Sequence, residues 1–402
     1  MEISTPKDRI EVIDVLRGVT LFGIILVHFT EQYYAGQMPA AQSGDPINKP
    51  IIDLIISGIV GILIQGKFFM IFSFLFGLSF FIQLNKSDKQ ATFLVRFIWR
   101  LIVLFLIGFV HSLHYRGDIL TIYAVLGFVL LLCYKLPDKV LLVAAILLII
   151  NVPSIIVRTI GLIFPASGPG LMDQDQAVLN LYWQTLKTGS YLDILTANVY
   201  EIKGKFEFQV IFGRLYITMG LFLLGLYAGR KNTFQNLKLF KRLTRYSLWT
   251  LLACVVTALG VFSALNFAKI EITQQIGIFV GGGLMDIFNA ALATIYVSLI
   301  ITMFNGEAKK KLMIFFSVGR MGLTTYLMQT LVGIFLFFSI GLNQLGVLGT
   351  TACAGIGIAV FALQIAFSNF WLKHFYYGPV EWLWRSLTYL KVQPFRRVAL
   401  NT

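Results

Sequence analysis

Long apolar stretches recur along most of the chain and are separated by short polar segments. A helix that crosses a bilayer needs about 20 mostly apolar residues. Stretches of this kind lie near residues 13–30, 67–84, 95–114, 118–134, 140–163, 208–229, 246–266, 277–304, 313–338 and 346–370. The pattern therefore predicts an all-α, polytopic transmembrane helix bundle of about 10 spans, within a range of roughly 9–11.

The apolar stretch over residues 50–65 is shorter than a typical span and contains Asp53. Two interpretations are open. It is either an interfacial or re-entrant helix that leads into the second span, or a complete span of its own. The second interpretation would change the number of spans and, with it, the side on which later loops lie.

The composition supports a membrane protein and excludes several other classes. Of the 402 residues, 57% are hydrophobic and 13% are charged, whereas an ordinary soluble domain has about 25% charged residues. So few charges cannot coat a soluble globule of this length. A large soluble enzyme, a disordered chain and a disulfide-stapled secreted domain are therefore excluded.

The distribution of basic residues predicts the orientation in the membrane. In a soluble protein, the net charge of +14 would suggest a nucleic-acid partner. With a cytoplasmic N-terminus, however, 22 of the 33 Lys and Arg residues fall in inner segments, 8 in outer segments and 3 within spans. Such a bias is typical of cytoplasmic loops. We therefore expect both termini in the cytoplasm, basic loops in contact with membrane lipids, and no nucleic-acid partner.

The longest interruption of the apolar pattern divides the chain into three parts. These are an N-terminal transmembrane half (1–165), an extracytoplasmic loop (166–206) and a C-terminal transmembrane half with a cytoplasmic tail (207–402). The loop is long enough to form a lid or a small cap. The sequence shows no internal repeat, which disfavours a transporter built from repeats.

Ionisable side chains in the first predicted span are candidates for a functional site. Asp14 and Arg17 lie three residues apart at its cytoplasmic end, and His28 lies at its outer end on roughly the same helix face. Charges inside a bilayer are costly and usually mark a site or a buried pair. A local ion pair is the simpler interpretation of Asp14 and Arg17, and Gly18 beside them would allow close approach of another helix.

The third predicted span carries polar groups at both ends. Arg96 and Arg100 share a face at the inner end, where they would hold a phosphate or lipid head groups. His111 and His114 lie at the outer end and Asp118 follows, and a carboxylate that orients an imidazole suits general base catalysis. Asp118 as the N-cap of the next helix is an equally simple interpretation, and both can hold. Two histidines without a third ligand at suitable spacing make a metal site unfavourable.

Other polar side chains in or beside the spans are candidates for substrate contacts: Lys67, Tyr123, Arg214, Asp286 and Gln329. Arg214 and Asp286 are isolated charges that would pair with each other or with the histidines. Arg320 is a further candidate for binding phosphate. After the last span, Glu381 and Arg385 have the spacing and order that favour an ion pair on a helix.

Several of these segments together resemble the YeiB-like family of bacterial multi-pass membrane proteins, known as domain of unknown function 418. The resemblance runs nearly end to end. It rests on residues 9–29 with IDVLRG and GIILVH, and on GKFFMIFSFLFG, GFVHSLHYRGDILTIYAVLG, GRMGLTTYLMQT and GPVEWLWRSLTY. His111 and Asp118 match the family's H…GD motif, whereas the family often has Asn at the position of His28.

The family is in turn similar to transmembrane acyltransferases, including the acyltransferase-3 family and heparan-α-glucosaminide N-acetyltransferase. The shared feature is the D-x-x-R-G motif, formed here by Asp14, Arg17 and Gly18. In acyltransferase-3 proteins a His follows an Arg eleven residues on, and Arg17 and His28 reproduce this spacing. The resemblance implies transfer of an acyl group from cytoplasmic acyl-CoA to an extracytoplasmic glycan or lipid-linked glycan, in the bacterial cytoplasmic membrane.

Two functions are therefore open. As an acyltransferase, the chain would bind acyl-CoA as donor, without a metal, through Asp14, Arg17, Arg96, Arg100 and Arg320. Its catalytic set would comprise His28, His111, His114 and Asp118. As a transporter or a lipid- or solute-handling protein, the chain would line a path with the same charges and use the histidines as proton carriers. A homo-oligomer is compatible with either function.

Overall fold

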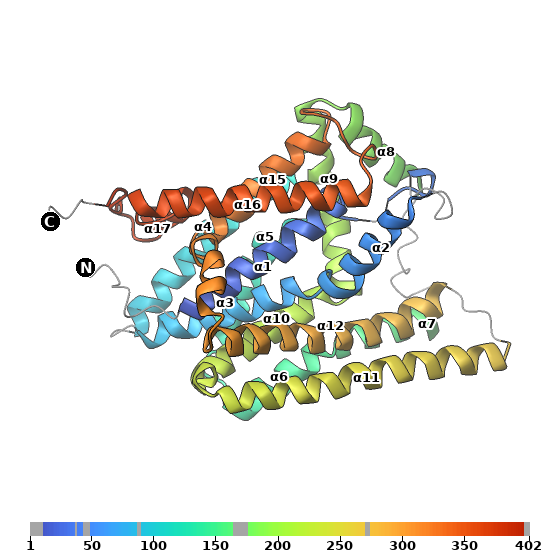
Figure 1. Ribbon diagram of the computed structural model, residues 1–402, viewed down its shortest axis with the longest axis horizontal. Helices are drawn as coiled ribbons and strands as arrows, with labels where there is room; N and C mark the ends of the chain where they lie inside the picture. Colours follow the sequence, from blue (N-terminus) through green and yellow to red (C-terminus); the bar gives the residue numbers. More distant parts are fainter. Residues whose placement is uncertain are drawn as a thin grey trace.

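The computed structural model describes residues 11–36, 38–42, 49–86, 90–163, 176–269 and 274–397. Within these ranges the regular elements are helices. The longer ones are α1 (Glu11–Thr30), α2 (Ile51–Ile59), α3 (Phe68–Asn85), α4 (Gln90–His114), α5 (Leu120–Cys133), α6 (Asp138–Ile149), α7 (Val152–Ile163), α8 (Gln176–Thr188), α9 (Tyr191–Ile211), α10 (Arg214–Arg230), α11 (Leu237–Phe267), α12 (Gln274–Phe304), α15 (Gly322–Phe337), α16 (Thr350–His374) and α17 (Pro379–Thr388). Two short helices, α13 (Lys309–Leu312) and α14 (Phe316–Arg320), precede α15. Figure 1 shows their arrangement.

The chain is a helical membrane protein, as predicted. In the described ranges, 6 helices are long and apolar enough to cross a membrane, or up to 8 if each of two bent helix pairs is one span. The bent pairs are α6 with α7 and α9 with α10. The shorter apolar helices α5 and α15 coincide with two further predicted spans. The number of ten spans stays a prediction.

The apolar stretch over residues 50–65 forms a helix that leads into the next one. It comprises α2 and a π-helical turn, Val60–Ile64, and the chain turns at Gly66 before α3 begins. Gly66 has φ +84°, a left-handed conformation that a residue with a Cβ adopts only with strain. None of the α2 residues is buried, so this helix lies at the periphery of the bundle.

Helix α1 lies at the centre of the bundle and contacts α3, α14, α15 and α16. Leu16, Leu21 and Ile25 are fully buried along it. A Cβ at Gly18 would lie 2.1 Å from the carbonyl oxygen of Phe315, so α1 and the segment before α14 approach as closely as backbones can. The expected close approach at Gly18 is therefore confirmed.

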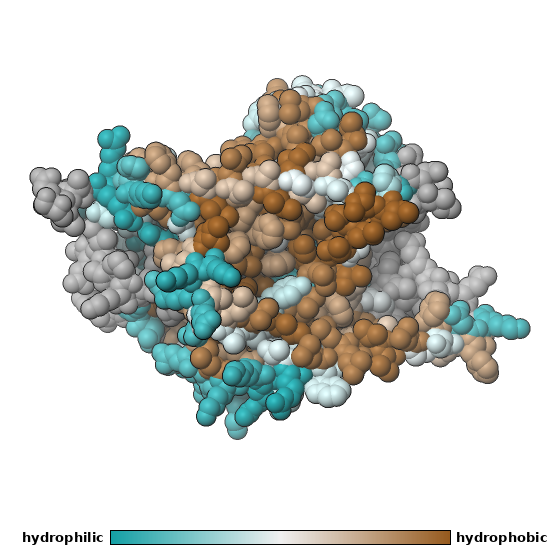
Figure 2. Space-filling view, viewed as in Figure 1, coloured by the Kyte–Doolittle hydropathy of each residue, from teal (hydrophilic) through white to brown (hydrophobic). Residues whose placement is uncertain are grey.

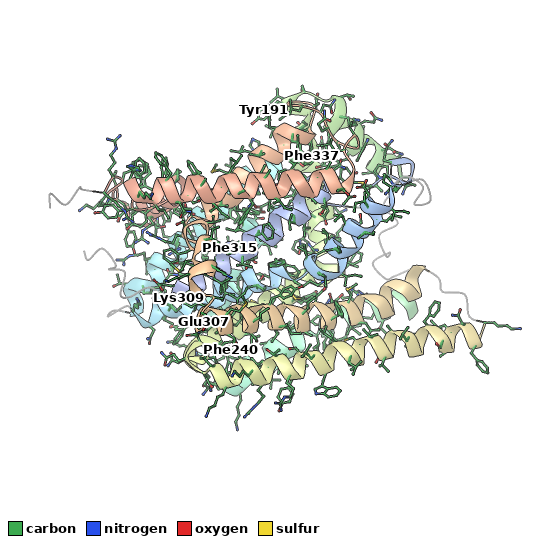
Figure 3. The ribbon with its side chains drawn as sticks, in the orientation of Figure 1. Tyr191, Phe240, Glu307, Lys309, Phe315 and Phe337 are labelled. Atoms are coloured by element: carbon green, nitrogen blue, oxygen red, sulfur yellow. The ribbon has the colours of Figure 1, made fainter. Side chains whose placement is uncertain are left out.

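The predicted cytoplasmic side corresponds to one end of the molecule. Helix α1 begins at the end where α17 lies, whereas α2 and α8 lie toward the opposite end (Figure 1). Exposed basic residues gather at the first end: Lys231, Lys238, Lys241, Arg242, Arg245, Lys309, Lys310 and Lys311. Figure 2 shows hydrophilic side chains at this end, beside a broad hydrophobic surface over the middle of the molecule. Lys309 forms an ion pair of 2.8 Å with Glu11, and it lies far from Tyr191 and Phe337 (Figure 3).

The described part of the segment 166–206, which was expected to form an outer loop, lid or small cap, is helical. Helices α8 and α9 pack as a pair, and Ser190 begins α9 with a capping box to Asp193. The buried residues Leu179, Tyr182, Trp183 and Leu186 recur at helical spacing along α8, which is the signal that reveals this helix. Residues 166–175 of this segment lie outside the described residues, as do three basic residues counted for the cytoplasmic side: Lys7, Arg9 and Lys89.

Candidate functional site

His111 and Asp118 form a buried hydrogen-bonded pair at the end of the molecule opposite α17. His111 lies in the last turn of α4, and Asp118 lies in the turn that leads into α5. The His111 Nδ1 is 2.7 Å from Asp118 Oδ1, and the His111 Nε2 is 2.9 Å from the Thr330 Oγ1 on α15. Both ring nitrogens therefore have partners, which fixes the orientation of the imidazole.

Asp118 has several roles at once. It accepts hydrogen bonds from the backbone N–H groups of Leu120 and Thr121, both at 3.0 Å, and from the Thr121 hydroxyl at 2.6 Å. Its Oδ2 is also 3.4 Å from the Nζ of Lys205 on α9. The two interpretations of Asp118, as a partner of histidine and as a cap of the next helix, thus both describe the structure.

His28 joins this group through aromatic rings. Its ring centroid lies 5.3 Å from that of Tyr115 and 6.2 Å from that of Tyr326. The ring of His111 lies 5.9 Å and 5.2 Å from the same two tyrosines. The His28 Nδ1 is buried and has no hydrogen-bond partner among the described residues. We call this group, with Asp118 and Thr330, the histidine cluster.

Two members of this environment were not predicted. Thr330 and Lys205 reach His111 and Asp118 from α15 and α9, which are distant in sequence. Only helix packing brings them together, and no local spacing indicates it. The sole sequence signal was the unusual polarity of the α15 segment around Gln329.

Two other predicted residues lie apart from the cluster. The ring nitrogens of His114 bond the carbonyl of Val110 and the hydroxyl of Tyr191, at 2.8 Å and 2.7 Å. The hydroxyl of Tyr123 is 2.6 Å from that of Ser73 within an aromatic core. Each therefore has its own structural partners.

Lys67 and Gln329 also make structural contacts. Lys67 Nζ is directed back onto its own chain, where it donates to the carbonyls of Gly61 and Gln65 at 3.2 Å and 2.8 Å. Gln329 lies between α1 and α16, and its Nε2 is 3.1 Å from the Gln364 Oε1. The Gln329 Oε1 is buried without a hydrogen-bond partner among the described residues.

Arg214 and Asp286 do not pair directly in the described structure. Asp286 accepts a hydrogen bond of 2.8 Å from the Asn151 amide, while the Arg214 guanidinium lies over the rings of Phe69 and Phe208. Arg214 is nevertheless within electrostatic range of Asp286 and of Glu31. Arg214 and Asp286 thus lie near each other without a direct salt bridge in the described structure.

A second group of charged residues lies at the α17 end. Arg17 forms the expected ion pair with Asp14 at 2.8 Å and also contacts Ser79. Arg100 bonds the Gln83 amide oxygen at 2.6 Å, and Arg17 and Arg385 lie within electrostatic range of it. We call Arg17, Arg96, Arg100 and Arg385 the arginine cluster.

Aromatic residues of and beside α17 contact three members of this cluster. Arg100 lies 4.0 Å from the ring centroid of Trp384, and Arg96 and Arg385 lie 5.0 Å and 5.7 Å from that of Tyr389. Such cation–π contacts are attractive but do not neutralise charge. The Arg385 Nε is buried without a hydrogen-bond partner among the described residues.

The expected Glu381–Arg385 ion pair does not form in the described structure. Glu381 instead accepts hydrogen bonds from the backbone N–H groups of Leu323 and Thr324, at 2.7 Å and 3.0 Å. These are free donors at the start of α15, so a helix N-terminus outcompetes the local partner. Arg320, the further candidate for binding phosphate, donates to the Tyr376 carbonyl at 3.3 Å.

The described side chains include no group of three or more His, Cys, Asp or Glu residues that could hold a metal ion. The histidine cluster and the arginine cluster each offer a different chemistry. One cluster can accept a proton, and the other can bind an anion.

Relatives align with the chain over nearly its full length. The family model described as "Protein of unknown function (DUF418)" matches residues 228–391. The chain is similar to the uncharacterized protein YxaH of Bacillus subtilis (strain 168), with 30% identity over 99% of this chain and 98% of that protein. It is also similar to the uncharacterized protein YeiB of Escherichia coli (strain K12), with 26% identity over 95% and 96%. No solved structure matches the chain.

Proposed function

The chain belongs to the YeiB-like family of DUF418 proteins, and from its two polar clusters we propose that it is an acyltransferase of the bacterial cytoplasmic membrane. It would move an acyl group, such as acetyl, from cytoplasmic acyl-CoA to an extracytoplasmic acceptor such as a cell-envelope glycan. The observation that carries this proposal is the buried His111–Asp118 pair, at the opposite end of the bundle from the arginine cluster.

The arginine cluster suits the phosphates of coenzyme A. Arginine binds phosphate through paired, charge-assisted hydrogen bonds, and the described ion pairs provide the cluster with one carboxylate partner, Asp14. From Arg17 to His28, eleven residues of α1 rise about 16 Å. An extended pantetheine arm covers such a distance, so a donor bound at one end can present its thioester near the other.

The histidine cluster would provide the base. An acceptor hydroxyl or amine would occupy the place of the Thr330 hydroxyl at the Nε2 of His111. As its oxygen or nitrogen attacks the thioester carbonyl, its proton passes to Nε2. The C–S bond then breaks, and the coenzyme A thiolate takes the proton from His111. Asp118 holds the opposite ring nitrogen and stabilises the imidazolium. His28, with its free Nδ1, is the alternative base beside the same tyrosines.

The test is acyl transfer by the purified protein in vesicles of bacterial lipid extract. Radiolabelled acetyl-CoA is supplied on the cytoplasmic face, and the release of the coenzyme A thiol is measured. Loss of a general base typically costs at least about 100-fold in rate, which we expect for His111→Gln. His374→Gln is the matched control, because His374 is exposed at the end of α16 and its ring bonds the Phe370 carbonyl.

The outcome also separates the two functions. If the wild-type protein releases no coenzyme A and coenzyme A does not shift its thermal unfolding, the acyltransferase proposal is wrong. A transporter or a lipid- or solute-handling protein then accounts better for the charges. If transfer proceeds unchanged in His111→Gln and fails in His28→Gln, the base is His28.

A further inference from the structure

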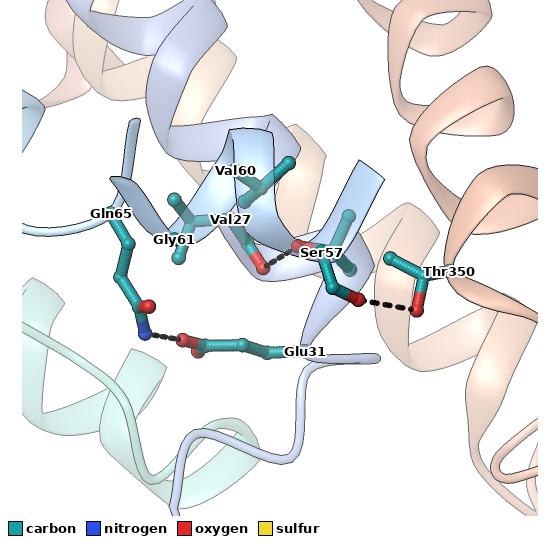
Figure 4. Close-up of a pocket in the computed structure, with 8 residues that line it drawn as sticks. Val27, Glu31, Ser57, Val60, Gly61, Gln65 and Thr350 are labelled. Carbon is teal, nitrogen blue, oxygen red and sulfur yellow. Dashed lines mark hydrogen bonds between the residues drawn. The ribbon is translucent and has the colours of Figure 1, made fainter. Parts of the chain in front are cut away.

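A small pocket lies at the outer end of α1, where α1, the α2–π segment and the start of α16 meet. Its volume is about 180 Å³, and the polar side chains that line it are those of Thr30, Glu31, Ser57, Gln65 and Thr350. Gln65 Nε2 donates to Glu31 Oε1 at 2.8 Å, and the Ser57 hydroxyl donates to that of Thr350 at 3.2 Å (Figure 4). These two bonds hold four of the lining side chains in place before any ligand binds.

The lining favours a ligand that carries hydroxyl groups. Serine and threonine hydroxyls and the glutamine amide can each both donate and accept hydrogen bonds, as sugar hydroxyls do. Burial raises the pKa of Glu31, against the opposing effects of Arg214 and Gln65. A carboxyl whose charge is costly is suited to uncharged partners and unsuited to a phosphate.

The backbone of the pocket wall departs from a regular α-helix. The π-helical turn Val60–Ile64 widens the helix there, and such turns often occur at functional sites. Lys67 secures the turn through the carbonyls of Gly61 and Gln65. A Cβ at Gly61 would meet no atom within 4 Å. With a volume of about 180 Å³, the pocket suits a small head group such as one sugar ring.

An apolar surface continues from the pocket along α2. None of the residues of this helix is buried, and five isoleucines of α2 and of the π-helical turn are exposed: Ile51, Ile52, Ile55, Ile59 and Ile62. In a membrane protein such a face contacts hydrocarbon. A ligand that fills both regions has a small polar head and an apolar chain.

We propose that this pocket binds the head group of a membrane lipid with uncharged hydroxyls, such as a glycolipid with one sugar, while its acyl chains lie along α2. The pocket belongs to the same outer end of α1 as His28, three residues before Glu31. The assignment of this lipid as the acyl acceptor rests on the function proposed above. Binding of the lipid requires no acyl transfer and can be tested alone.

The test is native mass spectrometry of the detergent-solubilised protein, without acyl-CoA. The protein is titrated with monoglucosyl diacylglycerol, and with phosphatidylglycerol and phosphatidylethanolamine of the same acyl chains. We expect the glucosyl lipid to bind at least about tenfold more tightly than the other two. Gly61→Leu, which places a side chain in the pocket wall, is expected to abolish this preference. Gly58→Leu is the matched control, because Gly58 has equally open surroundings but does not line the pocket.

Several results would overturn the proposal. Equal binding of the three lipids would show that the pocket does not recognise hydroxyls. Unchanged binding in Gly61→Leu, in a variant that unfolds at the wild-type temperature, would place the lipid elsewhere. Preferred binding of phosphatidylethanolamine that is lost in Glu31→Gln would make the pocket an ammonium site. A protein that prefers the glucosyl lipid but transfers no acyl group would retain this inference and lose the function proposed above.

Discussion

The His111–Asp118 pair of the histidine cluster and the arginine cluster differ in how completely their polar atoms are hydrogen-bonded. In the histidine cluster, His111 and Asp118 are buried, and their polar atoms are bonded to Thr330, Thr121 and Lys205. In the arginine cluster, several cations gather around one paired carboxylate, and aromatic rings fill much of the remaining contact. A fully bonded pair holds one geometry, whereas a group of like charges attracts anions through its summed field.

Because of this difference, we expect the two clusters to contribute to different properties of the protein: one mainly to folding stability, the other mainly to anion binding. Substitutions in the histidine cluster should cost folding free energy as well as activity, because they leave buried groups without partners. Substitutions in the arginine cluster should mainly cost affinity for an anion, because they also relieve repulsion among cations.

The largest loss in the free energy of unfolding is expected for Asp118→Asn. The substitution keeps the size of the side chain but removes the negative charge that His111, Thr121 and Lys205 all contact. Losing one partner of a buried charged pair typically costs about 3 kcal/mol or more. Denaturant unfolding in detergent should show this loss, with Asp193→Asn, at an exposed helix start, as the control. Equal stability of the two variants would mean that the network is not the rigid element.

Arg100→Gln should show the opposite behaviour. It removes one cation from beside Arg17 and Arg385, so we expect the affinity for coenzyme A to fall about tenfold, which corresponds to about 1.4 kcal/mol. The free energy of unfolding should change little. Calorimetry with coenzyme A measures the affinity, and Lys238→Gln provides an exposed cation at the same end of the molecule as control. A large loss of stability without loss of affinity would contradict the comparison.

The sequence predicted the helical membrane fold because long apolar stretches leave few alternatives. It did not reveal α9, because charged residues such as Asp193 and Glu201 interrupt the apolar residues there, whereas the apolar residues of α8 do recur at helical spacing. The Asp14–Arg17 pair and the neighbourhood of His111 and Asp118 were also predictable, because each is local in sequence.

The rest of the site depends on contacts between distant helices. His111 and Thr330 are 219 positions apart, and no local pattern indicates that they meet. Likewise, Arg385 was expected to pair with Glu381 on its own helix, but free N–H groups at the start of α15 bind that carboxylate instead. Spacing along one helix identifies which side chains share a face, and packing decides what that face meets.

A smaller effect is expected for Thr330→Val. Valine has nearly the shape of threonine but cannot bond the Nε2 of His111. An unmade hydrogen bond of this kind costs about 1 kcal/mol, so the free energy of unfolding should fall by this amount. Thr330→Ser, which retains the hydroxyl, should stay close to the wild type. The same loss in both variants would trace the effect to packing of the methyl group rather than to the hydrogen bond.

The smallest expected change in stability concerns Glu381, which connects α17 to α15. It thereby helps to position the aromatic residues that contact the arginine cluster. Burial raises the pKa of its carboxyl, and the hydrogen bonds from Thr324 only partly oppose this. The folded chain therefore holds the proton more tightly than the unfolded chain. The stability that this group contributes is present below the unfolded pKa and is lost as the pH rises through the folded one.

Between pH 5 and 7 the free energy of unfolding of the wild type should therefore decline by about 1 kcal/mol or less through this group. We expect Glu381→Gln to lose this decline and Glu307→Gln, at an exposed position, to keep it. A wild-type stability that rises over this range through Glu381 would reverse the sign and show that the carboxylate is stabilised by the α15 N-terminus more than burial costs it.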